Sequence, residues 1–351
     1  MNSTGADSGV DPSLLVEIKK LEDAAKQFQQ ESKYVEAIGI LEELLKIKKI
    51  NFGTNSREFT RTCKQLCEIC NILAVYYLKK EDINSALDLL KKSEELCENN
   101  ELGQAMTFNN MACYYRRIGK MRTALNFLQK ALQIESRLQR PEIQADTHLN
   151  ICAVLSQLNK HELALNHAMS AVILLQEIML RRRLDPTPNP DDDEDYSSSA
   201  VGDGSSKDRT AVLAIAYHNM GVEQEFLRSY PAAILSYKKA VNFAEKHLGV
   251  EDGITQNLRN VYENARNELD VAVFKKTKKG NAGATGGKGV TASKYYQSGK
   301  PKKGPGAKQG GQELYENMMT PRNEMERVDE EQEDVHGQDE RQEEIKDQNL
   351  Q

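Results

Sequence analysis

The sequence contains no tryptophan, and aromatic residues make up only 6% of its 351 residues. Sandwiches and barrels of β-strands draw on aromatic and β-branched side chains, so this composition argues against an all-β fold. No apolar run reaches the roughly 20 residues that a membrane-spanning helix needs, which predicts no membrane span. The first ten residues are polar and lack the basic-then-apolar order of a secretory signal. We therefore expect a cytoplasmic protein.

Cysteine is also sparse, with six residues that all fall in stretches of helical periodicity. Without a secretory context they do not form a disulfide framework. Cys63, Cys67 and Cys70 share one stripe of a predicted helix, but no fourth cysteine or paired histidine lies near them in sequence. A structural zinc site usually has four ligands, so we predict small buried thiols rather than a metal site, and no cofactor.

A pattern of small residues recurs five times with the same internal spacing. In each copy, a small residue of one predicted helix precedes an alanine of the next helix by twelve positions. Two antiparallel helices joined by a short turn can approach closely only where side chains are small. The predicted packing pairs are Ala25 and Ala37, Ala74 and Ala86, Ala112 and Ala124, Cys152 and Ala164, and Gly221 and Ala233.

The residues around these pairs agree with helical hairpins. Four positions after the second-helix alanine stands Leu41, Leu90, Leu128, Ala168 or Tyr237, which would fill the space beside the contact. Turn residues lie between the predicted helices at 80–82, 118–120 and 158–160. Asp11 and Pro12 would start the array as an N-cap and a first-turn proline. The pattern predicts an all-α fold of about five helix-turn-helix repeats.

This pattern resembles the tetratricopeptide repeat family over roughly residues 12–274. The separations of 38 residues from Ala86 to Ala124 and 40 from Ala124 to Ala164 exceed the family's period of about 34. Longer helices, with 52–56 and 247–249 after second helices, resemble the kinesin-light-chain subclass. The resemblance implies a right-handed superhelical solenoid whose first helices line a concave groove. It also implies a non-enzymatic scaffold or adaptor that binds a peptide or helix of a partner protein.

Composition divides the chain into a repeat domain and several polar segments. Residues 1–11 are expected to be a disordered N-terminus, and 12–274 the repeat domain, in which 254–274 forms a capping helix. A stretch at about 184–209, with three prolines and an acidic run at 191–195, predicts a disordered insertion. Residues 275–312 hold ten lysines, ten glycines and no acidic residue, whereas 313–351 hold fourteen acidic and four basic residues. Both segments are predicted to be disordered.

From the third repeat onward, asparagine recurs one residue before a large apolar residue of the first helix, which is Met111, Ile151 or Met220, and Val261 in the predicted capping helix. The resemblance implies that this position faces the groove, where amides could donate to and accept from a peptide backbone. The alternative is that these amides pack against the neighbouring repeat. Asn109, which precedes Asn110, and the two arginines that follow Tyr115 extend the predicted groove. The predicted groove residues are Asn109, Asn110, Arg116, Arg117, Asn150, Asn219 and Asn260.

Two other functions stay open at this point. The basic segment 275–312 could bind tubulin tails, which would make the chain a microtubule-, cilium- or axoneme-associated component or a motor-cargo adaptor. The same segment could bind RNA, although it has few aromatic residues and no Arg-Gly repeats. No Ser-His-Asp arrangement or carboxylate pair is placed in one cleft by the pattern. An enzyme is therefore not predicted.

Overall fold

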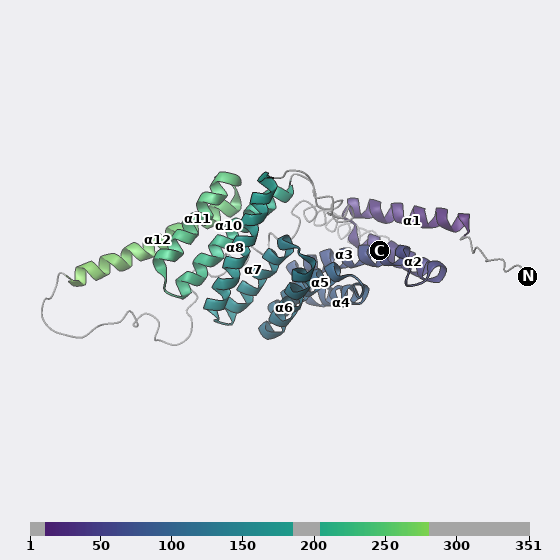
Figure 1. Cartoon of the computed structure of the whole chain (residues 1–351), viewed down its shortest axis with the longest axis horizontal. Coiled ribbons are helices and arrows are strands. Elements are labelled where there is room, and N and C mark those ends of the chain that lie inside the picture. Colours follow the sequence, from purple (N-terminus) through teal and green to yellow (C-terminus); the bar gives the residue numbers. More distant parts are fainter. Residues whose placement is uncertain (1–10, 185–203, 281–351) are drawn as a thin grey trace, which may run out of the picture. The chain divides into compact units, whose positions relative to one another are not determined.

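The structure is a computed structural model that describes residues 11–184 and 204–280. Within those ranges the chain forms helices and no strands, which confirms the all-α prediction (Figure 1). The described residues divide into two compact units, one ending at Leu138 and the other beginning at Gln139.

Unit 1 consists of three helical hairpins. The helices of each hairpin pack against each other, and α2 contacts α3 while α4 contacts α5. The first helices of the second and third hairpins, α3 and α5, also contact each other directly. The hairpins are α1 (Pro12–Gln30) with α2 (Tyr34–Phe52), α3 (Arg57–Lys79) with α4 (Ile83–Leu96), and α5 (Glu101–Arg117) with α6 (Met121–Leu138).

Unit 2 holds two further hairpins and a final helix. Helix α8 contacts α10 directly, and α7 also reaches α10, so successive hairpins stack here as well. The final helix packs against α11, as expected for a capping helix. The elements are α7 (Pro141–Gln157) with α8 (His161–Leu184), α10 (Gly204–Phe226) with α11 (Tyr230–His247), and α12 (Gly253–Gly280).

Some helices run further than the predicted domain boundaries. The predicted insertion at about 184–209 overlaps helices at both ends, because α8 continues to Leu184 and α10 already begins at Gly204. Helix α12 continues to Gly280, beyond the predicted end of the domain at 274. No proline interrupts the residues that extend α10 and α12, so the helical backbone can continue through polar sequence. The segments 1–10, 185–203 and 281–351 lie outside the described residues.

In the turn of every described hairpin, one residue has a left-handed backbone conformation. The φ angles of these central residues lie between 57° and 77°. The next residue donates its backbone N–H to the carbonyl five positions earlier, at 2.8–3.0 Å, which ties the turn to the end of the first helix. The turns predicted at 80–82, 118–120 and 158–160 are all of this kind. The five central residues are Ser32, Glu81, Gly119, Asn159 and Arg228.

The small residues of the repeat pattern lie in the core. All ten members of the five predicted pairs are buried. Gly221 shows why a small residue is needed, since a Cβ atom built there would lie 2.5 Å from two ring carbons of Tyr237. The large ring on the second helix thus fits only because the first helix carries no side chain at that point.

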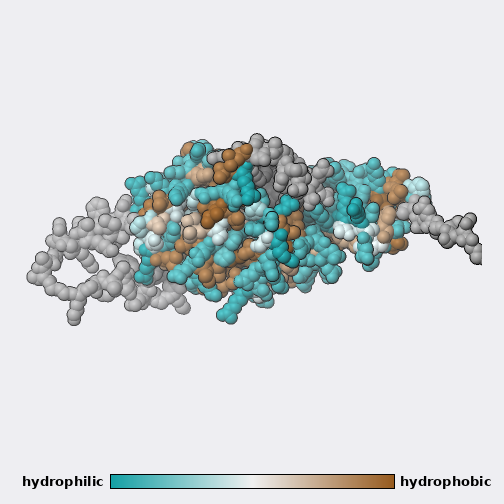
Figure 2. Space-filling model, in the orientation of Figure 1, coloured by the Kyte–Doolittle hydropathy of each residue, from teal (hydrophilic) through white to brown (hydrophobic). Residues whose placement is uncertain are grey.

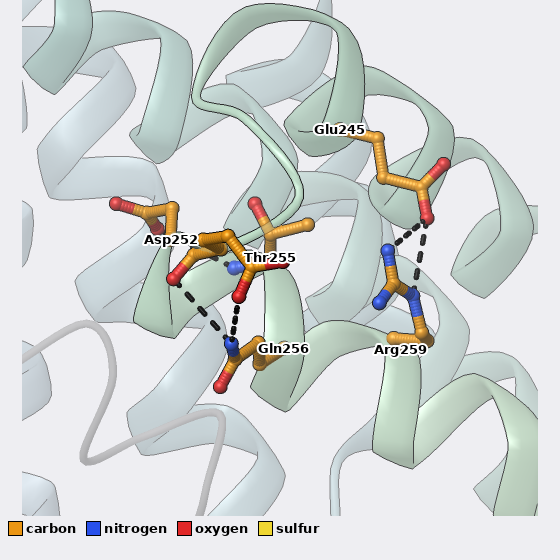
Figure 3. A network of polar contacts seen from close by, with 6 residues as sticks. Glu245, Asp252, Thr255, Gln256 and Arg259 are labelled. Carbon is orange, nitrogen blue, oxygen red and sulfur yellow. Dashed lines mark hydrogen bonds and ion pairs between the residues drawn. The ribbon is translucent and has the colours of Figure 1, made fainter.

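The ends of the array have their own contacts. Asp11 caps α1 by accepting from the backbone N–H of Ser13 at 3.0 Å, as the sequence predicts. Asp252 caps α12 in the same way, accepting from the N–H of Ile254 at 2.9 Å. Figure 3 shows the guanidinium of Arg259 on α12 donating twice to Glu245 of α11, at 2.7 and 3.2 Å. The contact between Arg259 and Glu245 links α12 to the last hairpin.

Helix α8 contains a longer apolar stretch than the sequence analysis expected. Its residues His161–Arg181 are long and apolar enough to do so by length and composition. However, the core helix of a soluble protein passes the same test, and α8 buries Ala164, Ala168 and Leu175 against its neighbours. Ile173 on the same helix is 61% exposed. On the face drawn in Figure 2, apolar residues form patches separated by hydrophilic residues.

Candidate functional site

The first helices of unit 1 meet through a pair of amides. Asn110 of α5 donates from Nδ2 to Oδ1 of Asn71 on α3, at 2.8 Å. Asn71 is buried, whereas Asn110 is half-buried. The carbonyl oxygen of Asn110 has no hydrogen-bond partner among the described residues. An oriented amide of this kind can still accept a hydrogen bond from a peptide backbone.

A buried polar cluster holds Asn71 in place. Its Nδ2 group lies 2.6 Å from Ser93 Oγ of α4, 3.0 Å from Thr107 Oγ1 of α5, and 3.0 Å from the carbonyl of Cys67. Its two hydrogens are therefore shared among three oxygen acceptors, which leaves Oδ1 to face Asn110. Because all three acceptors are buried, the Asn71 amide has little freedom to rotate.

The other predicted groove residues of unit 1 differ in exposure. Asn109 is buried and donates to Glu135 Oε1 of α6 at 2.9 Å, so it fastens the two helices of its own hairpin. Arg116 is buried as well. Arg117 is exposed at the end of α5. Of this set, Asn110 and Arg117 offer side chains to a partner most directly.

In unit 2 the predicted amides differ in exposure. Asn150 on α7 is buried, Asn219 on α10 is half-buried, and Asn260 on α12 is exposed. The recurring asparagine therefore does not have one environment. A buried amide such as Asn150 lies within the packing between helices, whereas Asn219 and Asn260 present part of their surface to solvent.

Two further polar contacts connect helices of unit 2. Arg209 of α10 donates to both carboxylate oxygens of Asp146 on α7, at 2.9 and 3.0 Å. Burial raises the pKa of Asp146, although the Arg209 charge opposes this shift. His161 of α8 lies 2.8 Å from the buried carboxylate of Glu223 on α10, and its ring stacks on Phe226 with centroids 4.1 Å apart. Burial raises the pKa of Glu223 as well.

Three further histidines of unit 2 have lowered pKa values. His148 and His167 face each other with their Nδ1 atoms 2.8 Å apart. Burial, together with the His167 ring, lowers the pKa of His148 to about 4, and burial also lowers the pKa of His167. His218 is buried beside Tyr237, and neither of its ring nitrogens has a partner among the described residues. Burial lowers the pKa of His218 to about 4.

These arrangements supply hydrogen-bond donors and acceptors between packed helices. Within the described ranges, no three histidine, cysteine or acidic side chains converge as metal ligands. The histidines pair with a carboxylate or with each other between packed helices rather than around a nucleophile. The exposed groups of the site are asparagine amides, which can form hydrogen bonds, and the positively charged side chain of Arg117.

Sequence reasoning missed two central residues. Leu73 is the large apolar residue of the second repeat that corresponds to Met111. Asn71 stands two residues before it rather than one, so it falls outside the asparagine series that the repeat alignment predicts. A signal was present, because Asn71 is a polar residue inside an otherwise buried stripe and polar residues there need partners. Glu223 was missed because it also lies outside the asparagine series. Its partner His161 is 62 positions away in the sequence.

A comparison with protein families supports the repeat assignment. Residues 66–136, which span α3 to α6, match the family model described as tetratricopeptide repeat. No curated protein matches the sequence.

Three solved structures are similar to this chain at 13–15% sequence identity. BtubC (BKLC) from P. vanneervenii is 14% identical, with 69% of this chain and 95% of that chain covered and a TM-score of 0.42. A Rap protein complexed with competence and sporulation factor is 15% identical, with coverages of 76% and 78% and a TM-score of 0.42. A putative kinesin light chain from Podosopora anserina with nearly identical TPR-like repeats is 13% identical, with coverages of 66% and 96% and a TM-score of 0.37. None of these likenesses bears on what this chain binds.

Proposed function

We propose that this chain, a tetratricopeptide repeat protein, is a non-enzymatic scaffold that binds a segment of a partner protein along its first helices. The supporting observation is the Asn71–Asn110 pair, which orients a half-exposed amide where α3 and α5 meet. A packing role alone would not require an amide whose carbonyl oxygen stays unpaired. Hydrogen bonds to a peptide backbone would give affinity with little demand on the partner's sequence.

The partner is expected to be an extended segment or a helix. Several modest contacts must add up, because each amide hydrogen bond contributes only about 1 kcal/mol. Asn110, Asn219 and Asn260 would supply amides, and Arg117 would favour an acidic group near the end of α5. Each unit would offer its own part of the binding surface.

Site-specific photocrosslinking can find the partner and test the surface together. A photoreactive residue at position 117 of the full chain should capture the partner in lysate, whereas the same residue at Asn126 on α6 should not. Position 126 is also exposed but lies on a second helix. Equal capture at both positions would contradict the proposed surface.

Calorimetry with the captured partner then tests the amides. Replacing Asn110, Asn219 and Asn260 together by alanine should weaken binding by about tenfold or more, because up to three hydrogen bonds are lost. The Asn126→Ala control should bind like the wild type. Unchanged affinity in the triple variant, with helical content intact, would mean that the amides are only structural.

A second contact through the charged C-terminal segments is also proposed. The segment 275–312 carries ten lysines without an acidic residue, which suits acidic tubulin tails in a cytoplasmic or ciliary setting. The six cysteines are free thiols, as in a reducing compartment. Microtubule co-sedimentation that disappears when 275–312 is deleted would support this contact, and binding to single-stranded RNA instead would favour the RNA alternative.

A further inference from the structure

Two histidines of unit 2 face each other across the α7–α8 hairpin. His148 lies on α7 and His167 on α8. Their Nδ1 atoms lie 2.8 Å apart, and their ring centroids are 5.0 Å apart. Both side chains are half-buried, so the pair is held between two packed helices while part of its surface stays in contact with solvent.

Packing of the repeat does not require histidine at these positions. Counted from the small-residue pair of the hairpin, His148 stands four residues before the first member and His167 three residues after the second. In α5–α6 the same positions hold Phe108 and Phe127, whose ring centroids are 5.7 Å apart. Two imidazoles at this place therefore need an explanation other than filling space. The matching pairs in the other hairpins of unit 1 are also apolar, namely Leu21 with Ile40 and Cys70 with Leu89.

The separation of the two nitrogens suits chelation of a metal ion at a right angle. Imidazole nitrogens bind zinc and its first-row neighbours at about 2.0–2.1 Å, so two nitrogens at 90° around one ion lie about 2.8–3.0 Å apart. Tetrahedral coordination would spread them to about 3.3–3.4 Å. The observed separation of 2.8 Å matches the right angle. Sites of nitrogen and oxygen ligands with this angle are typical of Cu(II) and Ni(II).

We propose that His148 and His167 form a chelating site for a divalent late transition metal ion of the Ni(II) and Cu(II) class. Without metal, one Nδ1 carries a proton and donates it to the other in a hydrogen bond. On binding, this proton leaves Nδ1 and the ring becomes the Nε2–H tautomer, so both Nδ1 lone pairs bind the ion and both rings stay neutral. No third histidine, cysteine or acidic side chain among the described residues joins the pair, so water completes the coordination.

Protons compete weakly for this site at neutral pH. Burial, together with the His167 ring, lowers the pKa of His148 to about 4, and burial lowers the pKa of His167. Metal ions bind the neutral imidazole, so neither ring has to lose a charge near pH 7. The solvent-exposed side of the pair lets the ion keep water ligands, which limits the cost of bringing its charge between the helices.

Calorimetric titration of the untagged full chain with Ni(II) tests the site. The wild type should bind one ion per chain. His148→Phe and His167→Phe should each weaken binding at least about tenfold, because a single nitrogen cannot chelate. The double variant reproduces the phenylalanine pair of α5–α6, so it should keep the wild-type helical content. Unchanged Ni(II) affinity in the double variant would overturn the proposal, as would a wild type that does not bind Ni(II).

The matched control is His247→Gln. It removes a half-buried imidazole of α11 that faces Phe243 rather than a second histidine. This variant should bind Ni(II) like the wild type. An equal loss of affinity in His247→Gln and in the two single phenylalanine variants would indicate scattered binding to single histidines and would also overturn the proposal.

Electron paramagnetic resonance with Cu(II) gives a readout that stands even if the double variant does not fold. The wild-type chain, given less Cu(II) than one ion per chain, should show a tetragonal signal with splitting from two imidazole nitrogens. Splitting from only one nitrogen would contradict chelation by the pair. Neither measurement depends on the proposed partner binding.

Discussion

Acid is predicted to destabilise unit 2 through His218. The side chain is buried without a hydrogen-bond partner among the described residues, and burial lowers its pKa from 6.5 to about 4. In the unfolded chain the same group titrates near 6.5. Between these two values the unfolded state binds more protons, so stability is complete above pH 6.5 and falls as the pH drops towards 4.

The size of the effect follows from the two pKa values. At pH 5 the unfolded histidine is almost fully protonated and the folded one is mostly neutral, which costs about 2 kcal/mol relative to pH 7.5. His218→Leu should remove this cost, since leucine has a similar volume and does not titrate. At pH 7.5 the variant should be at least as stable as the wild type, because no hydrogen bond is lost and a polar ring leaves the core.

Hydrogen exchange measured by mass spectrometry can check this prediction locally. The opening free energy of the α10 amides should fall by about 2 kcal/mol more in the wild type than in His218→Leu between pH 7.5 and pH 5. The neighbouring groups His148, His167 and Glu223 are present in both chains, so the difference isolates His218. Amides of unit 1, whose described residues include no histidine, serve as an internal reference. An equal pH dependence in both chains would refute the reasoning.

Three further changes should alter stability in chemical denaturation. Gly221→Ala should destabilise unit 2 by about 1–3 kcal/mol through the clash with Tyr237, and adding Tyr237→Leu should restore most of the loss; no recovery would contradict the contact. Arg209→Met should cost about 3 kcal/mol by removing the positive charge that compensates the Asp146 carboxylate, and adding Asp146→Asn should recover part of it, whereas an unchanged stability of the single variant would argue against the ion pair. Asp82→Ala should cost about 1 kcal/mol, since its carboxylate caps α4 through the N–H of Ser85, and an unchanged midpoint would show that the cap contributes nothing.

Local pattern was enough to predict the hairpins. The twelve-residue spacing between small residues places pairs such as Ala74 and Ala86 in the core, where the structure buries them. The turn at Gly119 follows from one glycine between two periodic segments. Glu81 and Arg228 adopt the same left-handed backbone without being glycine or asparagine, so residue type alone does not reveal every turn. In those turns the packing of the two helices imposes the conformation.

The polar contacts between helices could not be predicted in the same way. The bond from Asn110 to Asn71 depends on the register of α3 against α5, and a shift of one position would separate the amides. The series of asparagines suggested equivalent environments, yet Asn150 is buried and Asn260 is exposed. Burial depends on which helix follows in the stack, and the repeat pattern carries no information about that neighbour.

The Gly221–Tyr237 contact has a consequence for how such repeats change during descent. In this hairpin the first helix has no side chain at position 221, and the Tyr237 ring of the second helix fills the space between the two sites. The size of the side chain allowed at position 221 therefore depends on the residue at position 237, and the reverse also holds. Mutations at the two sites should become fixed together, and the same exchange of bulk is available wherever a hairpin closes around a small residue.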